Sequence, residues 1–106
     1  MDEFLYIIIS ATSREEADRI SEVLVKKKLI AGSLILKGDS RFWWKGKVQK
    51  EPYWNVHAHS LAGNRERIIE VVEGMHKDEV PIIAFLKLDG NEKFLNWIRE
   101  EIGNGF

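Results

Sequence analysis

The three histidines are the side chains of this chain best suited to bind a metal ion. His57 and His59 are two residues apart, so on a β-strand both rings point to the same face and can reach one ion. His76 is followed by the carboxylates of Asp78 and Glu79, which can join it in a second site. Neutral imidazole suits Cu(II), Zn(II) and Ni(II). The alternative for each histidine is a hydrogen-bonded or solvated side chain, because such pairs also arise on strands without a ligand.

The chain contains no cysteine, which excludes disulfides, thiolate metal sites and a cysteine nucleophile. It also contains no Ser-His-Asp pattern, glycine-rich phosphate loop or HExxH motif. Neighbouring residues on a helix do not face each other, so we predict that the acidic pairs Glu15–Glu16 and Glu100–Glu101 are solvated. We therefore expect a binding protein and not an enzyme, with the reservation that a cleft between chains can assemble a site that one chain does not reveal.

The segment FWWKGKVQKEPYW, residues 42–54, is a second candidate functional region, because it combines aromatic side chains with lysines. Such a mixture is typical of a surface that stacks nucleic-acid bases. It is equally typical of a hairpin with buried aromatics and solvated lysines. A nucleic-acid-binding protein normally has a clear excess of Lys and Arg, whereas here 16 basic residues face 17 acidic ones and the net charge is −1. We therefore favour the hairpin and expect no nucleic-acid partner.

The elements that position these residues follow from the apolar pattern. Phe4–Ile9 is a continuous apolar, β-branched run, which indicates a strand buried on both faces. Ser13 and Glu16 are spaced as a capping box, which predicts a helix from there to about Lys28.

A long hairpin is predicted next, because two extended runs flank a short glycine-containing turn. The proline of its returning strand is expected at a bulge or an edge, since proline cannot donate to a strand ladder. The predicted parts of the hairpin are a strand over Leu29–Leu36, a bend or bulge at Lys37–Ser40, a continuation over Arg41–Trp44, a turn at Lys45–Lys47 and a returning strand over Val48–Leu61.

The second half of the chain predicts a helix, a strand and a helix. The markers are the helically spaced Ile68, Val71, Val72 and Met75, the apolar run after Pro81, and the helically spaced Phe94, Leu95, Ile98 and Ile102. The complete order predicts an α+β fold, a ferredoxin-like βαββαβ sandwich with a long hairpin between its second and third strands and an extra C-terminal helix. At 106 residues, positions 1–106 are expected to form one domain.

Two helices can cover only one face of such a sheet. In the returning strand Trp54, Val56 and Ala58 alternate with Tyr53, Asn55, His57 and His59, so the two sets point to opposite faces. An uncovered apolar face would be larger than monomers usually expose, so a nucleic acid, a ligand or another subunit is expected to cover it. The hairpin is too long for one small sheet, and we predict that it packs on a neighbouring chain. The aromatics expected at this subunit contact are Phe42, Trp43, Trp44, Tyr53 and Trp54.

Several segments together resemble one known family. KKKLIAGSLILKGDSRFWWKGKVQKE is similar to the "LIA", spacer and aromatic-Trp-x-Gly-Lys hairpin of the divalent-cation-tolerance (CutA) family. HKDEVPIIAF resembles that family's His-x-x-x-x-Pro entry to the last strand, and GNEKFLNWI resembles its C-terminal helix. The resemblance covers nearly the whole chain in the right order. It implies a ferredoxin-like homotrimer with its sheets inside, a response to copper and other divalent metal ions, and architectural kinship with PII signalling trimers.

The chain departs from this family where metal would matter. Gly32 and Ile9 stand where cysteines are found in the family, and His76-Lys77-Asp78 stands for its His-Pro-Tyr. A soft thiolate site for Cu(I) is therefore not available. The remaining expectation is weak binding of copper or zinc through His57, His59 or His76.

Two other functions remain open from the sequence. A PII-like trimer would bind a nucleotide or other small ligand between subunits, with phosphate contacts from Arg41, Lys45, Lys47 and Lys50. An RRM-like single-stranded nucleic-acid binder shares the βαββαβ order, but the strand YWNVHAHSL lacks its aromatic motif. The acidic start and the six-residue run FLYIII fit neither a signal peptide nor a membrane span, so we expect a cytoplasmic protein without a membrane partner.

Overall fold

A computed structural model describes residues 3–103 of the chain. It contains one four-stranded antiparallel sheet with the strand order β2-β3-β1-β4, as the expected α+β, ferredoxin-like arrangement requires. The elements are β1 (Phe4–Ile9), α1 (Arg14–Lys26), β2 (Gly32–Trp44), β3 (Lys47–Leu61), η1 (Ala62–Asn64), α2 (Arg65–Met75), β4 (Ile83–Lys87) and α3 (Glu92–Ile102).

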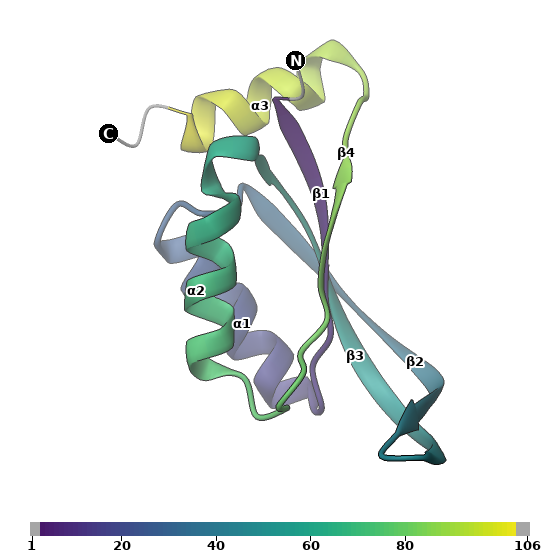
Figure 1. Cartoon of the computed structure of the whole chain (residues 1–106). Helices are drawn as coiled ribbons and strands as arrows, with labels where there is room; N and C mark the ends of the chain where they lie inside the picture. The colour runs from purple at the N-terminus through teal and green to yellow at the C-terminus, as the bar shows by residue number, and fades with distance from the viewer. Residues whose placement is uncertain (1–2, 104–106) are drawn as a thin grey trace.

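Helices α1 and α2 lie side by side over one face of the sheet, and α3 crosses one end of it (Figure 1). The main core forms between this face and the two helices because the inward residues of the strands are apolar. Its fully buried members include Ile7, Ile9, Ile20, Leu24, Val56, Ala58, Ile68 and Val72. A smaller cluster, formed by Phe4, Ile98 and Ile102, fixes α3.

The start of α1 confirms the predicted cap, and one prediction about it is wrong. The Oγ atom of Ser13 accepts the N–H of Glu16 at 3.0 Å. Glu16 was expected on the solvated surface, but its side chain is fully buried. The helix also ends at Lys26, two residues early, because Lys28 adopts a left-handed φ of 61° that a helix cannot continue.

The hairpin differs from the prediction in its start and its regularity. Strand β2 begins at Gly32, three residues later than expected. The predicted bend or bulge at Lys37–Ser40 is wrong, since pairing keeps one register from Gly32 opposite His59 to the turn. Gly38 lies directly opposite Tyr53, and the ladder continues through this pair without a bulge.

Pro52 of β3 lies at an edge and not at a bulge. Strand β1 pairs only with residues 56–61 of β3, so the rest of β3 has no strand on that side. The N–H of Trp54 points to that side and donates to Ala11 at 3.0 Å. Pro52 is two residues before Trp54, so its backbone nitrogen points to the same unpaired side. The N–H that proline lacks would therefore not have bonded to β2, and no hydrogen bond of the β2–β3 ladder is lost.

The outer part of the hairpin projects beyond the rest of the molecule (Figure 1), whose extents are 44 × 24 × 22 Å. Lys45 and Gly46 form its two-residue turn with φ angles of 50° and 81°. Positive φ at both positions is typical of a type I′ turn, which matches the twist of the two strands. We call residues 36–55, which extend past the strand β1 pairing, the arm.

Candidate functional site

The sheet face opposite α1 and α2, which we call the open face, is apolar and incompletely covered. The predicted alternation of β3 is confirmed, because Val56 and Ala58 are in the core whereas His57 and His59 lie on the open face. The register places even-numbered residues of β1, β2 and β4 on this same face. Large apolar residues exposed there are Leu34, Leu36, Ile82 and Leu86, between 47% and 60% accessible.

His57 and His59 are neighbours on the open face and differ in their partners. The Nδ1 atom of His57 is hydrogen-bonded to the hydroxyl of Tyr6. The ring of His59 packs edge-on against Phe94, with 5.0 Å between ring centroids. Burial lowers the pKa of His59, so its imidazole stays neutral, the form that binds a metal. Its Nδ1 atom is buried and has no hydrogen-bond partner among the residues that the structure describes.

His76 lies elsewhere, in the segment that follows α2, and both of its ring nitrogens are occupied. Its Nε2 atom bonds the carbonyl of Ser10, which can only accept, and its Nδ1 atom accepts the N–H of Asp78 at 3.0 Å. These two bonds assign the neutral tautomer with the proton on Nε2. Within residues 3–103, no group of three or more His, Asp or Glu side chains comes together to hold a metal ion.

Glu16 is the partner of this segment that the sequence reasoning missed. Its carboxylate accepts the N–H of Thr12 and the N–H of Lys77, both at 2.8 Å, and lies 3.8 Å from Nδ1 of His76. Burial opposes its ionisation, but these amides and the Thr12 hydroxyl outweigh it and hold the pKa of Glu16 below its ordinary value. The capping-box spacing was the available signal, because it directs a Glu side chain back toward the helix start and not into solvent.

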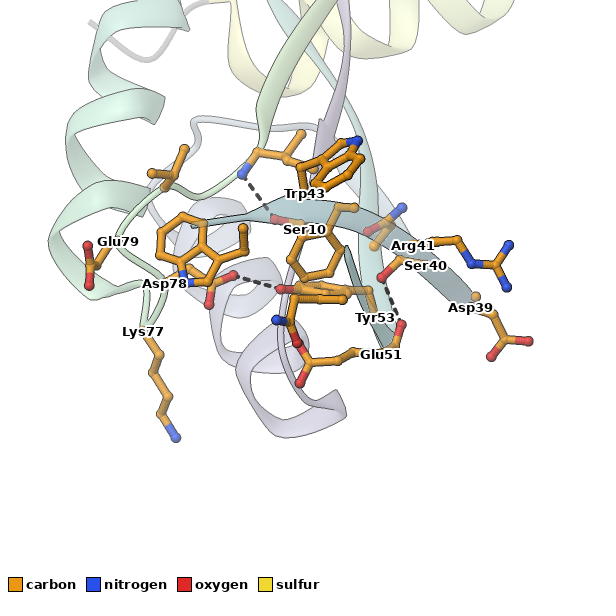
Figure 2. Close-up of a pocket in the computed structure, with 17 residues that line it drawn as sticks. Ser10, Asp39, Ser40, Arg41, Trp43, Glu51, Tyr53, Lys77, Asp78 and Glu79 are labelled. Atoms are coloured by element: carbon orange, nitrogen blue, oxygen red, sulfur yellow. Dashed lines mark hydrogen bonds between the residues drawn. The ribbon is translucent and has the colours of Figure 1, made fainter. Parts of the chain in front are cut away.

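A groove of about 820 Å³ lies between the arm and the segment after α2 (Figure 2). Tyr53 on the arm donates to Asp78 at 3.2 Å and so joins its two walls. Burial, together with the charge of Asp78, raises the pKa of Tyr53 to about 12, so this donor stays protonated. Figure 2 shows Asp78 and Tyr53 pointing toward each other, with Ser10 and Glu51 beside them. The groove thus combines an aromatic wall on the arm with many polar and charged side chains, of which the Tyr53–Asp78 pair is fixed by a hydrogen bond.

The five predicted contact aromatics divide between the two faces of the arm. Phe42, Trp44 and Tyr53 have the parity of the open face, and the rings of Phe42 and Tyr53 meet edge-on at 5.9 Å. Trp43 and Trp54 have the opposite parity. Trp54 packs against this chain's own core, with the Nζ atom of Lys37 5.2 Å from its ring centroid, whereas Trp43 is 73% exposed.

Comparison with known proteins agrees with this architecture. The family model for the CutA1 divalent ion tolerance protein matches residues 5–101. The chain belongs to the CutA1 family. This confirms the resemblance inferred from the LIA segment, the hairpin and the C-terminal helix.

Relatives of this CutA1 family member extend over most of its length. The divalent-cation tolerance protein CutA of Archaeoglobus fulgidus is 33% identical over 103 residues, which span 96% of this chain and 99% of that protein. A solved structure described as the periplasmic divalent cation tolerance protein CutA from Archaeoglobus fulgidus superposes with a TM-score of 0.90 over 93% of this chain and 98% of that one. The structure of the divalent cation tolerance protein from Thermus thermophilus also gives 0.90, at 27% identity over 94% and 99% of the two chains.

The compartment of this CutA1 family member is not given by its relatives. One relative is described as periplasmic, and a rice relative, 27% identical over 90% of this chain and 55% of its own length, is described as chloroplastic. Among the described residues, none of the helices has the length and apolar character needed to cross a membrane.

Proposed function

We propose that this CutA1 family member acts as a homotrimer in tolerance of divalent metal ions, by binding and not by catalysis. The observation that carries the proposal is the open face. Leu34, Leu36, Ile82 and Leu86 form an apolar surface that one chain leaves in water. These side chains lie at the two edges of the sheet, on β2 and along β4, with β3 and β1 between them. Monomeric proteins rarely expose much apolar surface on one face, whereas a closed cyclic assembly would bury it on every subunit.

The arm supports the same assembly. Phe42, Trp44 and Tyr53 continue the open face outward, beyond the area that one sheet can cover. A neighbouring chain packed on this face would bury them together with the groove, and the lysines of the turn would stay in water. Trp54 serves its own chain's core, so the proposed contact uses the three aromatics on the open-face side.

Metal binding in the proposed trimer would use imidazole. His59 fits this role best, because its pKa is lowered and its buried Nδ1 atom has no partner. One chain supplies too few ligands within residues 3–103, but a three-fold axis presents any residue near it three times. His57 is the candidate second ligand, and the occupied nitrogens of His76 make it the weakest of the three. Copper or zinc bound there would be held by neutral imidazoles alone.

Native mass spectrometry of metal-stripped protein, before and after addition of Cu(II) or Zn(II), tests assembly and metal together. The expected result is a mass near three 12.3 kDa chains that takes up metal in a fixed ratio to the trimer. The double variant His57→Ala/His59→Ala should keep the trimer and lose the metal. Asn55→Ala, on the same face of the same strand, is the matched control and should lose neither. Unchanged metal uptake by the trimeric double variant would refute the histidine site. A wild-type protein with the mass of a monomer would refute the proposed assembly.

A second candidate function is PII-like binding of a small ligand between subunits of a cytoplasmic trimer. The groove is the place for such a ligand, because the fixed Tyr53–Asp78 pair joins its walls and Arg41 and Lys77 lie in its lining. Its lining also carries four carboxylates, those of Asp39, Glu51, Asp78 and Glu79, so phosphate contacts would have to come from the two cations. Isothermal titration with ATP, ADP or inorganic phosphate tests this function. Binding that Arg41→Gln abolishes would support it, and the absence of binding by the intact trimer would count against it.

A further inference from the structure

The end of the arm combines exposed apolar and cationic side chains. We call residues 41–50 the arm tip. They include four of the chain's sixteen basic residues and none of its seventeen acidic ones. Arg41, Lys45, Lys47 and Lys50 are all exposed, at the point of the molecule that projects farthest from the helices (Figure 1). A chain of net charge −1 therefore carries a local positive pole at the end of its arm.

One face of the arm tip carries an exposed apolar pair. Trp43 follows Phe42 and precedes Trp44, so its ring has the opposite parity to the open-face aromatics. Its direct cross-strand partner is Val48. Trp43 is 73% exposed and Val48 is 53% exposed, and together they form an apolar wedge. In the single chain both side chains are accessible, and the ring of Trp43 also lines the groove.

The charges around the wedge have no partners of their own. Arg41 lies directly opposite Lys50 in the ladder. This pair is two ladder positions farther from the turn than the Trp43–Val48 pair, so it lies on the same face as the wedge. Like charges in this position repel each other. Within residues 3–103, the structure shows no ion pair for either side chain. An external anionic surface would satisfy both cations at once.

We propose that the arm tip docks on the surface of an anionic lipid bilayer. Tryptophan is enriched at membrane–water interfaces because its ring is apolar and its N–H stays wet, and nearby cations are attracted to anionic headgroups. The alternative, single-stranded nucleic acid, is bound in a groove that follows its backbone, with bases stacked on aromatic rings. The arm tip is instead a projecting turn, and Val48, the partner of Trp43, has no ring for a base to stack on.

The site is complete in one chain, and the proposed trimer would only multiply it. Rotation about a three-fold axis would place three arm tips at one height, so a flat surface that one tip reaches would be within reach of all three, with a gain in avidity. This inference replaces the expectation that the protein has no membrane partner. It involves docking alone, since none of the described helices is fit to span a bilayer.

Vesicle flotation tests the proposal. Full-length protein is mixed with vesicles of phosphatidylcholine alone or with roughly one-third phosphatidylserine, at low and high salt. The expected result is flotation with the phosphatidylserine vesicles that falls as salt rises. Trp43→Ser/Val48→Ser should abolish it. Arg41→Gln/Lys50→Gln should weaken it by about fivefold for each charge removed.

Matched controls change the same chemistry away from the arm. Val25→Ser removes an exposed aliphatic side chain of α1, and Lys26→Gln/Lys27→Gln removes two exposed cations, and both should float like the wild type. The proposal is overturned by no flotation at low salt, by flotation that the arm-tip variants leave unchanged, or by an oligonucleotide that these residues bind in place of vesicles. The mass of the wild type and of each variant, measured by light scattering, separates the two proposals. A wild type that is monomeric but still floats would refute the proposed trimer and support the docking surface.

Discussion

At the scale of single residues, Glu16 joins the start of α1 to a segment that is distant in sequence. Its carboxylate accepts N–H groups from Thr12 before α1 and from Lys77 after α2. His76, beside Lys77, then reaches the carbonyl of Ser10 at the end of β1. These bonds fix the segment that forms one wall of the groove, so a buried charge serves the position of the candidate site.

Glu16→Gln should therefore destabilise the protein. An amide has one acceptor oxygen, so one of the two N–H donors would face another donor, at a cost of about 2 kcal/mol. Because the folded-state pKa of Glu16 is below its reference of 4.5, its ionised form stabilises the fold above that pH. The stability difference between wild type and variant should be complete at neutral pH and shrink as the pH falls through the folded pKa. Urea unfolding at a fixed chain concentration measures it.

The neighbouring Glu15 provides the control. It is exposed, so Glu15→Gln should change the unfolding free energy by less than about 0.5 kcal/mol at any of these pH values. Equal losses in the two variants, or a Glu16→Gln loss that does not depend on pH, would contradict the assigned role of the buried carboxylate.

At the scale of elements, the arm depends on its turn because nothing else in the described part of the chain holds its end. Lys45 and Gly46 form the two-residue turn, and the pairing register runs unbroken from Trp44 opposite Lys47 back to Gly32. A two-residue loop fixes the register of both strands. The turn therefore decides which side chains share a face with Trp43 and which with Trp44.

Gly46→Val should loosen the arm. A β-branched residue at a φ of 81° costs about 1–2 kcal/mol, whereas asparagine tolerates this region, so Gly46→Asn should lose less. Hydrogen exchange of the arm tip should speed up in the valine variant and change little in the rest of the sheet. Gly38→Ala is the control, because an added Cβ there meets no atom within 4 Å. Similar exchange in the valine and asparagine variants would show that the turn geometry does not limit the arm.

At the scale of the whole molecule, the two faces of the sheet differ in how completely they are covered. One is covered by α1 and α2 (Figure 1). The other carries exposed leucines and an isoleucine beside the groove. Only α3 reaches the open-face side, where the indole of Trp97 lies 3.0 Å from the position of a Cβ on Gly32. Position 32, where the family has cysteine, is thus closely packed by an aromatic ring in this chain.

Leu34→Glu tests the burial of the open face. This side chain is 60% exposed in one chain, so the substitution should be nearly neutral for a monomer but should place a charge inside the proposed interface. Light scattering coupled to size exclusion should show loss of the trimer at micromolar concentration. Val25→Glu makes the same change at the 40% exposed Val25 on α1 and should keep the trimer. A Leu34→Glu variant with the mass of the wild type would show that the leucine lies outside any interface.

Local chemistry was decided by the sequence alone. The Ser13 cap, the alternation of Val56 with His57 and the glycine turn at Gly46 were predicted correctly, because each depends on residues within a few positions of one another. The same period of two already separates Trp43 from Trp44, although the prediction grouped them. Most of the family-level fold was also predictable, since the order of its elements limits the ways to cover one sheet.

Only the tertiary structure decided the environments that depend on distant partners. One of the two amides that hold the pKa of Glu16 low belongs to Lys77, 61 positions away, and the carbonyl that accepts from Nε2 of His76 belongs to Ser10. A rule based on spacing uses only residues that are close in sequence. The prediction therefore placed Glu16 in solvent and left His76 available to bind a metal. Burial and hydrogen bonding fix protonation, and both are set by which segments meet in space.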